Sequence, residues 1–141
     1  MLTLTTSQGL LMLKEHETLI RVRYAETDRM GFLHHAQYFV YFEEGRTELL
    51  RAQGKTYKAI EDKGFFLVIA KIECKFRMPI HYDDQIRLKT IMQRITPVRI
   101  EHRYELYRGE TLCAEGTSTL ACVDASGKLQ GLPEELLEES S

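Results

Sequence analysis

Apolar and polar residues alternate with a period of two along most of the chain after residue 64. Successive side chains of a strand point to opposite faces, so this alternation predicts half-buried β-strands. The strands are expected at residues 18–24, 66–76, 86–92, 98–106 and 112–122. Each has a single apolar face, which is typical of an antiparallel sheet with one buried side.

The period changes between the first and second of these strands. From His35 onward, the apolar residues Phe39, Phe42, Leu49 and Leu50 recur at spacings of three and four. This is the pattern of an amphipathic helix. Gly54 suits the position just after a helix end. We therefore predict one long helix over residues 35–53.

The segments between these elements have less pattern. Residues 25–33 are interpreted as a loop, residues 56–64 as a linker, and residues 133–139 as a short acidic helix. In the strand over 66–76, the even-numbered residues are expected to face the core. Arg108-Gly109-Glu110 indicates a tight hairpin.

The order of elements, one strand, one long helix and four strands, indicates an α+β fold. With one long helix to cover the apolar face, we expect a five-stranded antiparallel sheet wrapped around that helix. Residues 1–141 are expected to form one domain, with a core at about 17–124 and an extension at each end. An open sheet leaves two edges that need protection, so we expect a homo-oligomer.

Composition mainly excludes classes of function and of site. A net charge of -2 gives no electrostatic case for nucleic-acid binding, and no apolar run is long enough to span a bilayer. The N-terminus lacks a signal-peptide pattern, which favours a cytoplasmic protein. Cys74, Cys113 and Cys122 match neither a disulfide framework nor a metal site and are expected to be reduced. His34 and His35 have no acidic partner at metal spacing, so no metal is expected.

Asp28 lies in the loop just before the predicted helix. Its structural role would be to cap the helix or brace the loop. Its chemical role would be that of a base or nucleophile, with the free amides of the helix N-terminus stabilising an oxyanion. Residue pattern alone leaves both roles open.

The stretch YAETDRMGFLHHAQYFVYFEEGRTELLR, residues 24–51, resembles hotdog-fold acyl-CoA thioesterases of the 4-hydroxybenzoyl-CoA thioesterase type. It is most similar to the branch associated with the Tol–Pal cell-envelope operon. The resemblance extends over residues 17–124 and continues more weakly in Met78-Pro79 and Tyr82-Asp83-Asp84. It implies a hotdog fold, which agrees with the period analysis, and hydrolysis of an acyl-CoA thioester.

The resemblance also implies roles for individual residues. Asp28 takes the place of the catalytic aspartate, acting either as a nucleophile that forms a mixed anhydride or as a base for water. The backbone N–H of His35 takes the place of the oxyanion-hole donor, and its side chain assists. Tyr24 and Tyr38 are expected in the substrate pocket, together with His34, which stands where the family has an aromatic residue.

Arg94, Arg99 and Lys128 match the regions that supply cations for the phosphates of coenzyme A in this family. Coenzyme A is part of the substrate, and no cofactor is expected. In the family, the sites lie between subunits and the strand after the helix pairs with its twin. The resemblance thus implies a homodimer or homotetramer paired through residues 65–77.

Three alternatives stay open. A second class of hotdog thioesterase uses a glutamate on the helix, and Glu43 is so placed, although a structural pairing with Arg46 is expected for it. A hotdog hydratase or dehydratase would need an Asp/His pair placed for proton abstraction. A non-catalytic acyl-CoA-binding protein would share the fold without the chemistry. Short, long and aromatic acyl groups are all possible substrates.

Overall fold

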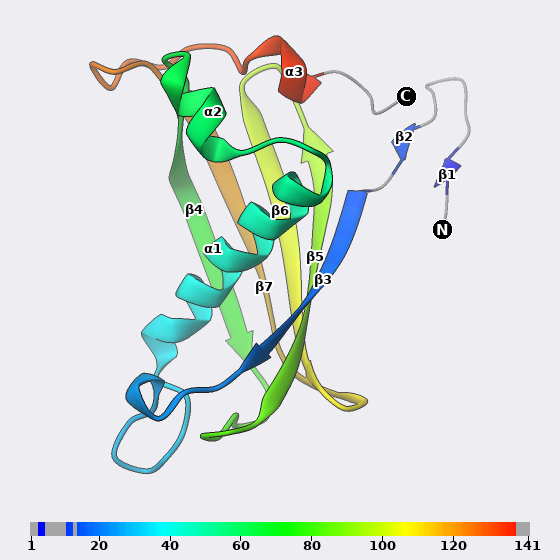
Figure 1. The fold of residues 1–141 in the computed structure, drawn as a ribbon, viewed down its shortest axis with the longest axis vertical. Helices are drawn as coiled ribbons and strands as arrows, with labels where there is room; N and C mark the ends of the chain where they lie inside the picture. The colour runs from blue at the N-terminus through cyan, green and yellow to red at the C-terminus, as the bar shows by residue number, and fades with distance from the viewer. Residues whose placement is uncertain (1–2, 5–10, 13, 138–141) are drawn as a thin grey trace.

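The computed structural model describes residues 3–4, 11–12 and 14–137. A five-stranded antiparallel sheet lies behind one long helix, as predicted (Figure 1). The sheet order is β3-β5-β6-β7-β4. Its strands are β3 (Lys14–Arg21), β4 (Phe66–Phe76), β5 (Gln85–Ile95), β6 (Arg99–Arg108) and β7 (Thr111–Val123).

The N-terminal extension lies mostly outside the described residues. Within it, β1 (Thr3–Leu4) pairs with β2 (Leu11–Met12). The first strand of the main sheet differs from its predicted range of 18–24. It begins earlier, at Lys14, and ends before Tyr24, because the chain tightens there into the 3-10 turn η1 (Tyr24–Glu26).

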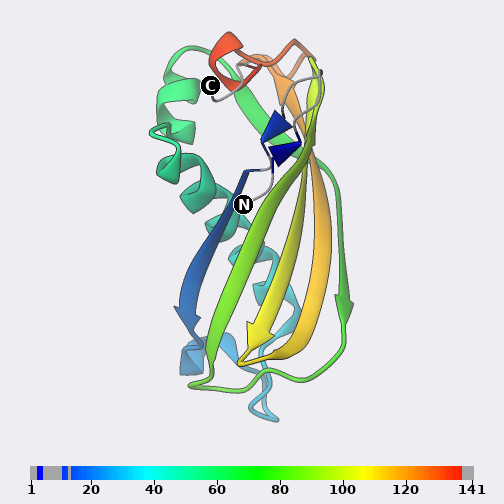
Figure 2. The same cartoon turned by 90° about the vertical axis from the view of Figure 1, so that its right-hand side faces the viewer.

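Helix α1 (His35–Ala52) confirms the predicted long helix. Gly54, with φ +82°, follows the C-cap residue Gln53. Its N–H bonds to the carbonyl of Arg51, and the next N–H, of Lys55, bonds to the carbonyl of Leu50. This is a Schellman ending, which needs a left-handed residue that glycine supplies without strain. The sheet curls around this helix when seen from the side (Figure 2).

The buried side of α1 contains three of the four apolar residues of the predicted stripe, namely Phe42, Leu49 and Leu50. Tyr38, Tyr41 and Phe42 are buried, whereas Phe39 is 37% exposed. Gly45 explains how closely the helix approaches the sheet. A Cβ atom at that position would collide with the side chains of Thr90 and Leu88 on β5. Only a residue without a side chain permits this contact.

Two short helices add to the predicted architecture. Residues expected to form a linker contain α2 (Tyr57–Asp62), capped by the Thr56 hydroxyl, which accepts a hydrogen bond from the Ala59 N–H at 3.1 Å. Helix α3 (Glu134–Leu137) lies within the predicted acidic helix, whose last residues are outside the described chain. Both helices cover a second hydrophobic cluster beyond the end of α1, formed by Leu50, Ile60, Ile100, Leu120, Cys122, Leu132 and Leu136.

Strand β4 faces the core with odd residues at its start and even residues at its end. Leu67 packs on the second cluster, whereas Ile72 and Cys74 pack on the first. A bulge between Ile69 and Lys71 shifts the register against β7 and reverses the alternation. The predicted even-numbered face is therefore wrong before the bulge and correct after it.

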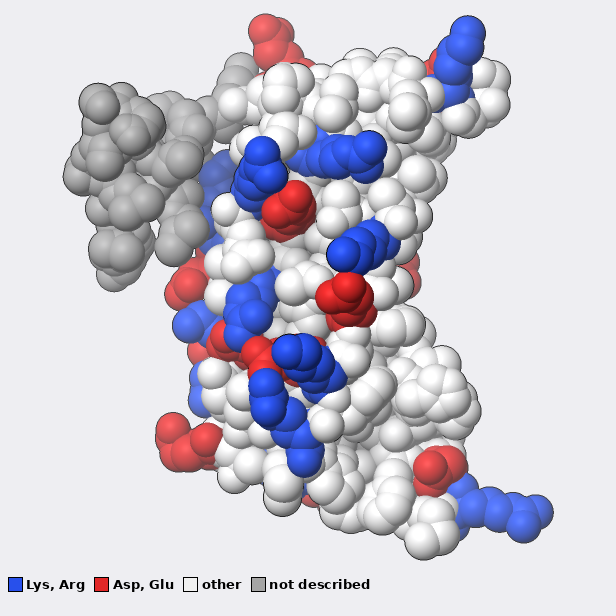
Figure 3. All heavy atoms as spheres, turned by 180° about the vertical axis from the view of Figure 1, so that it is seen from behind, with Lys and Arg blue, Asp and Glu red and all other residues white. Residues whose placement is uncertain are grey.

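A band of side chains with charges of both signs runs over the opposite face of the sheet (Figure 3). Ion pairs connect neighbouring strands: Arg87 of β5 with Glu17 of β3 at 2.9 Å, and Arg103 of β6 with Glu115 of β7 at 2.7 Å. Arg77, just after β4, also pairs with Glu115. The three cysteines lie in β4 and β7 as free thiols, as predicted.

His102 is a polar residue in the core, on the inner face of β6. It is 1% exposed, and its Nδ1 atom has no hydrogen-bond partner among the described residues. Burial, and to a lesser extent the charge of Arg46, lower its pKa from 6.5 to about 3. The folded state therefore holds the imidazole neutral, whereas the unfolded chain binds a proton near pH 6.5.

Acidification is thus expected to destabilise the fold through His102. The stabilisation is complete above pH 6.5 and is lost progressively toward pH 3. By linkage, the part already lost at pH 5 is about 2 kcal/mol. Urea unfolding of wild type and His102→Gln at pH 7 and pH 5 measures this loss. The variant should lose less stability between these pH values. An identical pH dependence in both proteins would contradict the assignment, and His81→Gln, at the surface, is the matched control.

Candidate active site

The segment before α1 folds back on itself. Thr27 and Leu33 form an isolated antiparallel bridge, and the N–H of Asp28 donates to the carbonyl of Phe32 at 2.8 Å. Gly31 turns the chain with a φ of +79°, which favours glycine. The fold-back places Asp28 opposite the residues that lead into the helix.

The two carboxylate oxygens of Asp28 differ in their surroundings. Oδ1 accepts hydrogen bonds from the N–H groups of Met30 at 2.8 Å and Phe32 at 3.1 Å. Oδ2 has no hydrogen-bond partner in the described part of the chain, and the residue is exposed. Asp28 thus braces its loop through one oxygen and leaves the other free to react. It does not cap α1.

The helix cap is His34. Its Nδ1 accepts a hydrogen bond from the N–H of Ala36 at 3.2 Å, and its ring stacks on that of His35 with 4.3 Å between centroids. His35 is the first helical residue, and its N–H donates to none of the residues that the structure describes. The free amide lies where the helix dipole is positive, so it can stabilise a developing negative charge.

Tyr38 lies one turn into α1 beside Asp28. Its ring is 4% exposed and packs edge-on against Phe76 of β4, with 4.7 Å between centroids. Burial raises the pKa of Tyr38 to about 12, with smaller contributions from the Cys74 and Cys113 thiols and from Asp28. Asp28 therefore lies on the turn that leads into His35, and its charge acts on Tyr38 one turn further along the helix.

Tyr24 stands at the outer side of this group. It is 77% exposed and meets Tyr82 edge-on, with 5.6 Å between ring centroids. Tyr82 belongs to the second, weaker part of the signature in the sequence. Two exposed aromatic rings thus flank the acidic turn.

The three predicted phosphate-binding cations lie elsewhere. Arg94 and Arg99 flank the β5–β6 turn, and Lys128 follows β7, all at the end of the sheet opposite to Asp28 (Figure 1). Strand β6 alone spans about 30 Å. Arg94 pairs with Glu101 at 3.7 Å, whereas the side chains of Arg99 and Lys128 contact no acidic group among the described residues. One chain does not unite these cations with the acidic turn.

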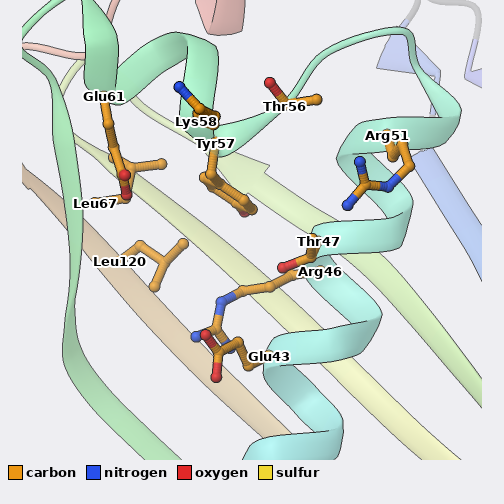
Figure 4. Close-up of a pocket in the computed structure, with 10 residues that line it drawn as sticks. All are labelled: Glu43, Arg46, Thr47, Arg51, Thr56, Tyr57, Lys58, Glu61, Leu67 and Leu120. Carbon is orange, nitrogen blue, oxygen red and sulfur yellow. The ribbon is translucent and has the colours of Figure 1, made fainter.

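A pocket of about 480 Å³ opens between α1 and α2 (Figure 4). Glu43 and Arg46 reach into it from α1, Tyr57 projects into it from α2, and Leu67 and Leu120 line its sheet side. The expected ion pair between Glu43 and Arg46 is absent from the described structure, and Arg46 instead donates to the Tyr104 hydroxyl at 3.4 Å. Glu43 is about 12 Å along the helix from His35.

Sequence reasoning missed Glu26. Its carboxylate is 7% exposed and accepts hydrogen bonds from the Tyr41 hydroxyl at 2.8 Å and from the Arg23 backbone N–H at 2.9 Å. Arg23 and Glu26 form the capping box of η1. Their spacing of three residues is a signal that the sequence contained, but the contact with Tyr41 is tertiary.

The described residues offer neither a metal site nor a membrane-spanning helix. No group of three or more His, Cys, Asp or Glu side chains is arranged to hold a metal ion. No helix there has the length and apolar character needed to cross a membrane.

Comparison with known proteins identifies relatives of the whole domain. The family model of the thioesterase-like superfamily matches residues 22–139. The Bacillus subtilis (strain 168) protein named "Putative acyl-CoA thioesterase YneP" is 36% identical over 107 residues, which cover 74% of this chain and 77% of that protein. The "Acyl-CoA thioester hydrolase YbgC" of Escherichia coli O6:H1 is 27% identical over 122 residues, or 85% and 91% of the two chains.

Solved structures agree with the sequence relatives. The crystal structure titled "Probable Thioesterase from Bartonella henselae" superposes with a TM-score of 0.80 at 29% identity, covering 84% of this chain and 99% of that one. The region that matches the family model, residues 22–139, includes the acidic turn, α1 and all strands after it. The chain therefore belongs to the thioesterase-like superfamily, with the hotdog arrangement of sheet and helix.

Proposed function

We propose that this protein hydrolyses acyl-CoA thioesters, with Asp28 and the His35 amide as its reacting groups. The observation that carries the proposal is the free Oδ2 of Asp28 beside a helix whose first N–H is also free. A carboxylate can act as base or nucleophile and an unpaired amide can stabilise the oxyanion, and enzymatic thioester hydrolysis uses both functions. The names of the relatives support the same substrate class.

The mechanism follows from these two groups. The thioester carbonyl oxygen accepts a hydrogen bond from the His35 N–H, which strengthens as negative charge develops there. Asp28 then acts in one of two ways. Its Oδ2 attacks the carbonyl carbon and expels the CoA thiolate, leaving an anhydride that water cleaves, or it takes a proton from an attacking water. Both routes yield a free acid and CoA.

The working unit is proposed to be a homodimer paired through β4. This strand is an edge of the sheet, and its Val68, Ile69 and Phe76 side chains are exposed. Phe39 and Val40 of α1 extend the apolar surface beside it. Exposed apolar surface along an open strand edge is typical of a surface that pairs with another chain.

Two-fold pairing also accounts for the separated cations. A two-fold axis would pair the β4 strands of the two copies in an antiparallel manner. One end of the first sheet would then lie beside the other end of the second sheet. The end carrying Arg99 and Lys128 in one copy would then approach the Asp28 end of the other. A site shared in this way unites the reacting groups of one chain with the CoA-binding cations of its partner.

Within the superfamily, we assign the protein to the 4-hydroxybenzoyl-CoA thioesterase type and to the Tol–Pal-associated branch. The support is the signature over residues 24–51, with Asp28 in the loop rather than a reacting glutamate on the helix. We also propose a cytoplasmic location, for which the support is the lack of a signal-peptide pattern in the sequence.

The proposal is tested by incubating purified protein with short, long and aromatic acyl-CoA esters and titrating the released thiol. At least one ester should be cleaved with a kcat/KM near the ordinary enzyme range of about 10⁴ M⁻¹s⁻¹ or above. Binding of acyl-CoA without thiol release would instead support a non-catalytic carrier. Addition of water to an unsaturated acyl-CoA, with the thioester intact, would support a hydratase.

Charge reversal of Arg94, Arg99 or Lys128 is expected to raise KM more than it lowers kcat. Contacts to the distant phosphates bind the ground state and the transition state alike. Steady-state kinetics on the best ester, at low and high salt, measure the effect, which salt should reduce. If KM is unchanged in all three variants, these residues do not bind the phosphates.

A further inference from the structure

Glu26 is a buried carboxylate that the proposed chemistry does not use. Each of its oxygens is engaged: Oε1 by the Tyr41 hydroxyl and the Arg23 N–H, and Oε2 by the Arg23 guanidinium at 3.0 and 3.1 Å. Burying a carboxylate is costly unless such hydrogen bonds replace water. Because both oxygens of the Glu26 carboxylate are hydrogen-bonded, this residue fixes the positions of the segments that it joins.

The connection runs in two directions. Through its side chain, Glu26 accepts a hydrogen bond from the hydroxyl of Tyr41 in the second turn of α1. Through its backbone carbonyl, it accepts a hydrogen bond from the N–H of His34 at 2.9 Å. His34 is the cap residue that immediately precedes the proposed oxyanion donor. One residue thus ties the helix body to the helix start.

Asp28 follows Glu26 by two residues on the same short turn. The bridge between Thr27 and Leu33 joins the two sides of that turn directly after Glu26. A shift of Glu26 would consequently move Asp28 and the His35 amide relative to each other. Burial alone would raise the pKa of Glu26, but its hydrogen bonds from Arg23 and Tyr41 keep the pKa below the ordinary value, so the tie stays ionised at neutral pH.

We propose that Glu26, held by the hydrogen bond from Tyr41, is a positioning residue that fixes the position of Asp28 relative to the His35 amide. This inference rests on the proposed thioesterase function. It assigns no contact with substrate to Glu26. Its effect on catalysis comes from geometry, because misplacing reacting groups by about 1 Å can cost on the order of 10²-fold in rate.

Two variants test the proposal. Glu26→Gln keeps the shape of the side chain but loses its charge, and Tyr41→Phe keeps the buried ring but loses the hydroxyl. We expect kcat to fall about 10²-fold in the first and roughly tenfold in the second, with KM little changed. Because both variants weaken the same contact, the double variant should be less impaired than the product of the single effects.

Glu115→Gln is the matched control. Glu115 also accepts hydrogen bonds from two arginines, Arg77 and Arg103. It points to the outer face of the sheet, because its neighbour Gly116 on β7 faces Phe42 of α1. It should lose stability without losing kcat. Wild-type kcat in Tyr41→Phe would refute the positioning role. The role would also be refuted if kcat fell with the loss of stability in the same proportion in Glu115→Gln as in the Glu26 and Tyr41 variants.

Amide hydrogen exchange gives a readout that does not depend on turnover. In Glu26→Gln and Tyr41→Phe, the amides of Asp28, Phe32 and His34 should exchange at least about tenfold faster, while those in β6 and β7 stay protected. Unchanged exchange at the turn would overturn the proposal even if kcat fell. If wild type cleaves no acyl-CoA, the thioesterase function fails, and the exchange rates alone decide whether Glu26 holds the turn.

Discussion

Asp28→Asn is expected to lower kcat by at least about 10²-fold while the protein stays folded. The amide oxygen of Asn can still accept the hydrogen bonds that Met30 and Phe32 donate to Oδ1. The amino group would replace the free Oδ2, which removes both the base and the anionic nucleophile. Thiol release from the best acyl-CoA measures the loss, and circular dichroism checks the fold.

Asp124→Asn is a matched control for this change. Its Oδ1 likewise accepts hydrogen bonds from two backbone N–H groups of an exposed turn, those of Ser126 at 2.8 Å and Lys128 at 2.9 Å. It should retain kcat, because it has bracing bonds but no helix start beside it. Equal kcat in wild type and Asp28→Asn would mean that Asp28 only braces its loop.

Val68→Arg is expected to convert the proposed dimer to a monomer and to abolish turnover along with it. The substitution places a like charge on the β4 edge of both copies, where apolar side chains are exposed. A site shared between subunits loses one half when they separate. Light scattering at micromolar concentration, combined with the thiol assay, shows whether mass and turnover fall together.

Leu19→Arg is the control for the other edge. Leu19 is 65% exposed on β3, which is the opposite edge strand of the same sheet. It should leave both mass and turnover unchanged. A wild-type protein that is monomeric and active would refute the shared site, and dissociation by Leu19→Arg alone would move the interface to β3.

The main architecture could be predicted because the two periodicities are clear in the sequence. The bulge in β4 could not, because residues 65–70 are apolar at odd and even positions alike and no alternation marks the register. Helix α2 was missed for a related reason. Its six residues pack only Tyr57 and Ile60 on the second cluster, and two positions are too few to establish a period.

The candidate site was predictable where it is local in the sequence. Asp28 and His35 are close because a short turn connects them, and a sequence shows such turns. The contact of Glu26 with Tyr41 depends on how the turn packs against the helix, fifteen residues away. In the proposed dimer, Arg99 and Lys128 would reach the site from the second chain, and neither their spacing in the sequence nor a single chain can place them there.

The central claim, that the loop aspartate performs the chemistry, is tested most directly by comparing kcat for wild type, Asp28→Asn and Glu43→Gln on one acyl-CoA. Glu43 lies about two turns along α1, exposed at the rim of the α1–α2 pocket. Loss of at least about 10²-fold in Asp28→Asn, with kcat retained in Glu43→Gln, is the predicted result. Wild-type turnover in Asp28→Asn and loss in Glu43→Gln would contradict it and assign the chemistry to the helix glutamate.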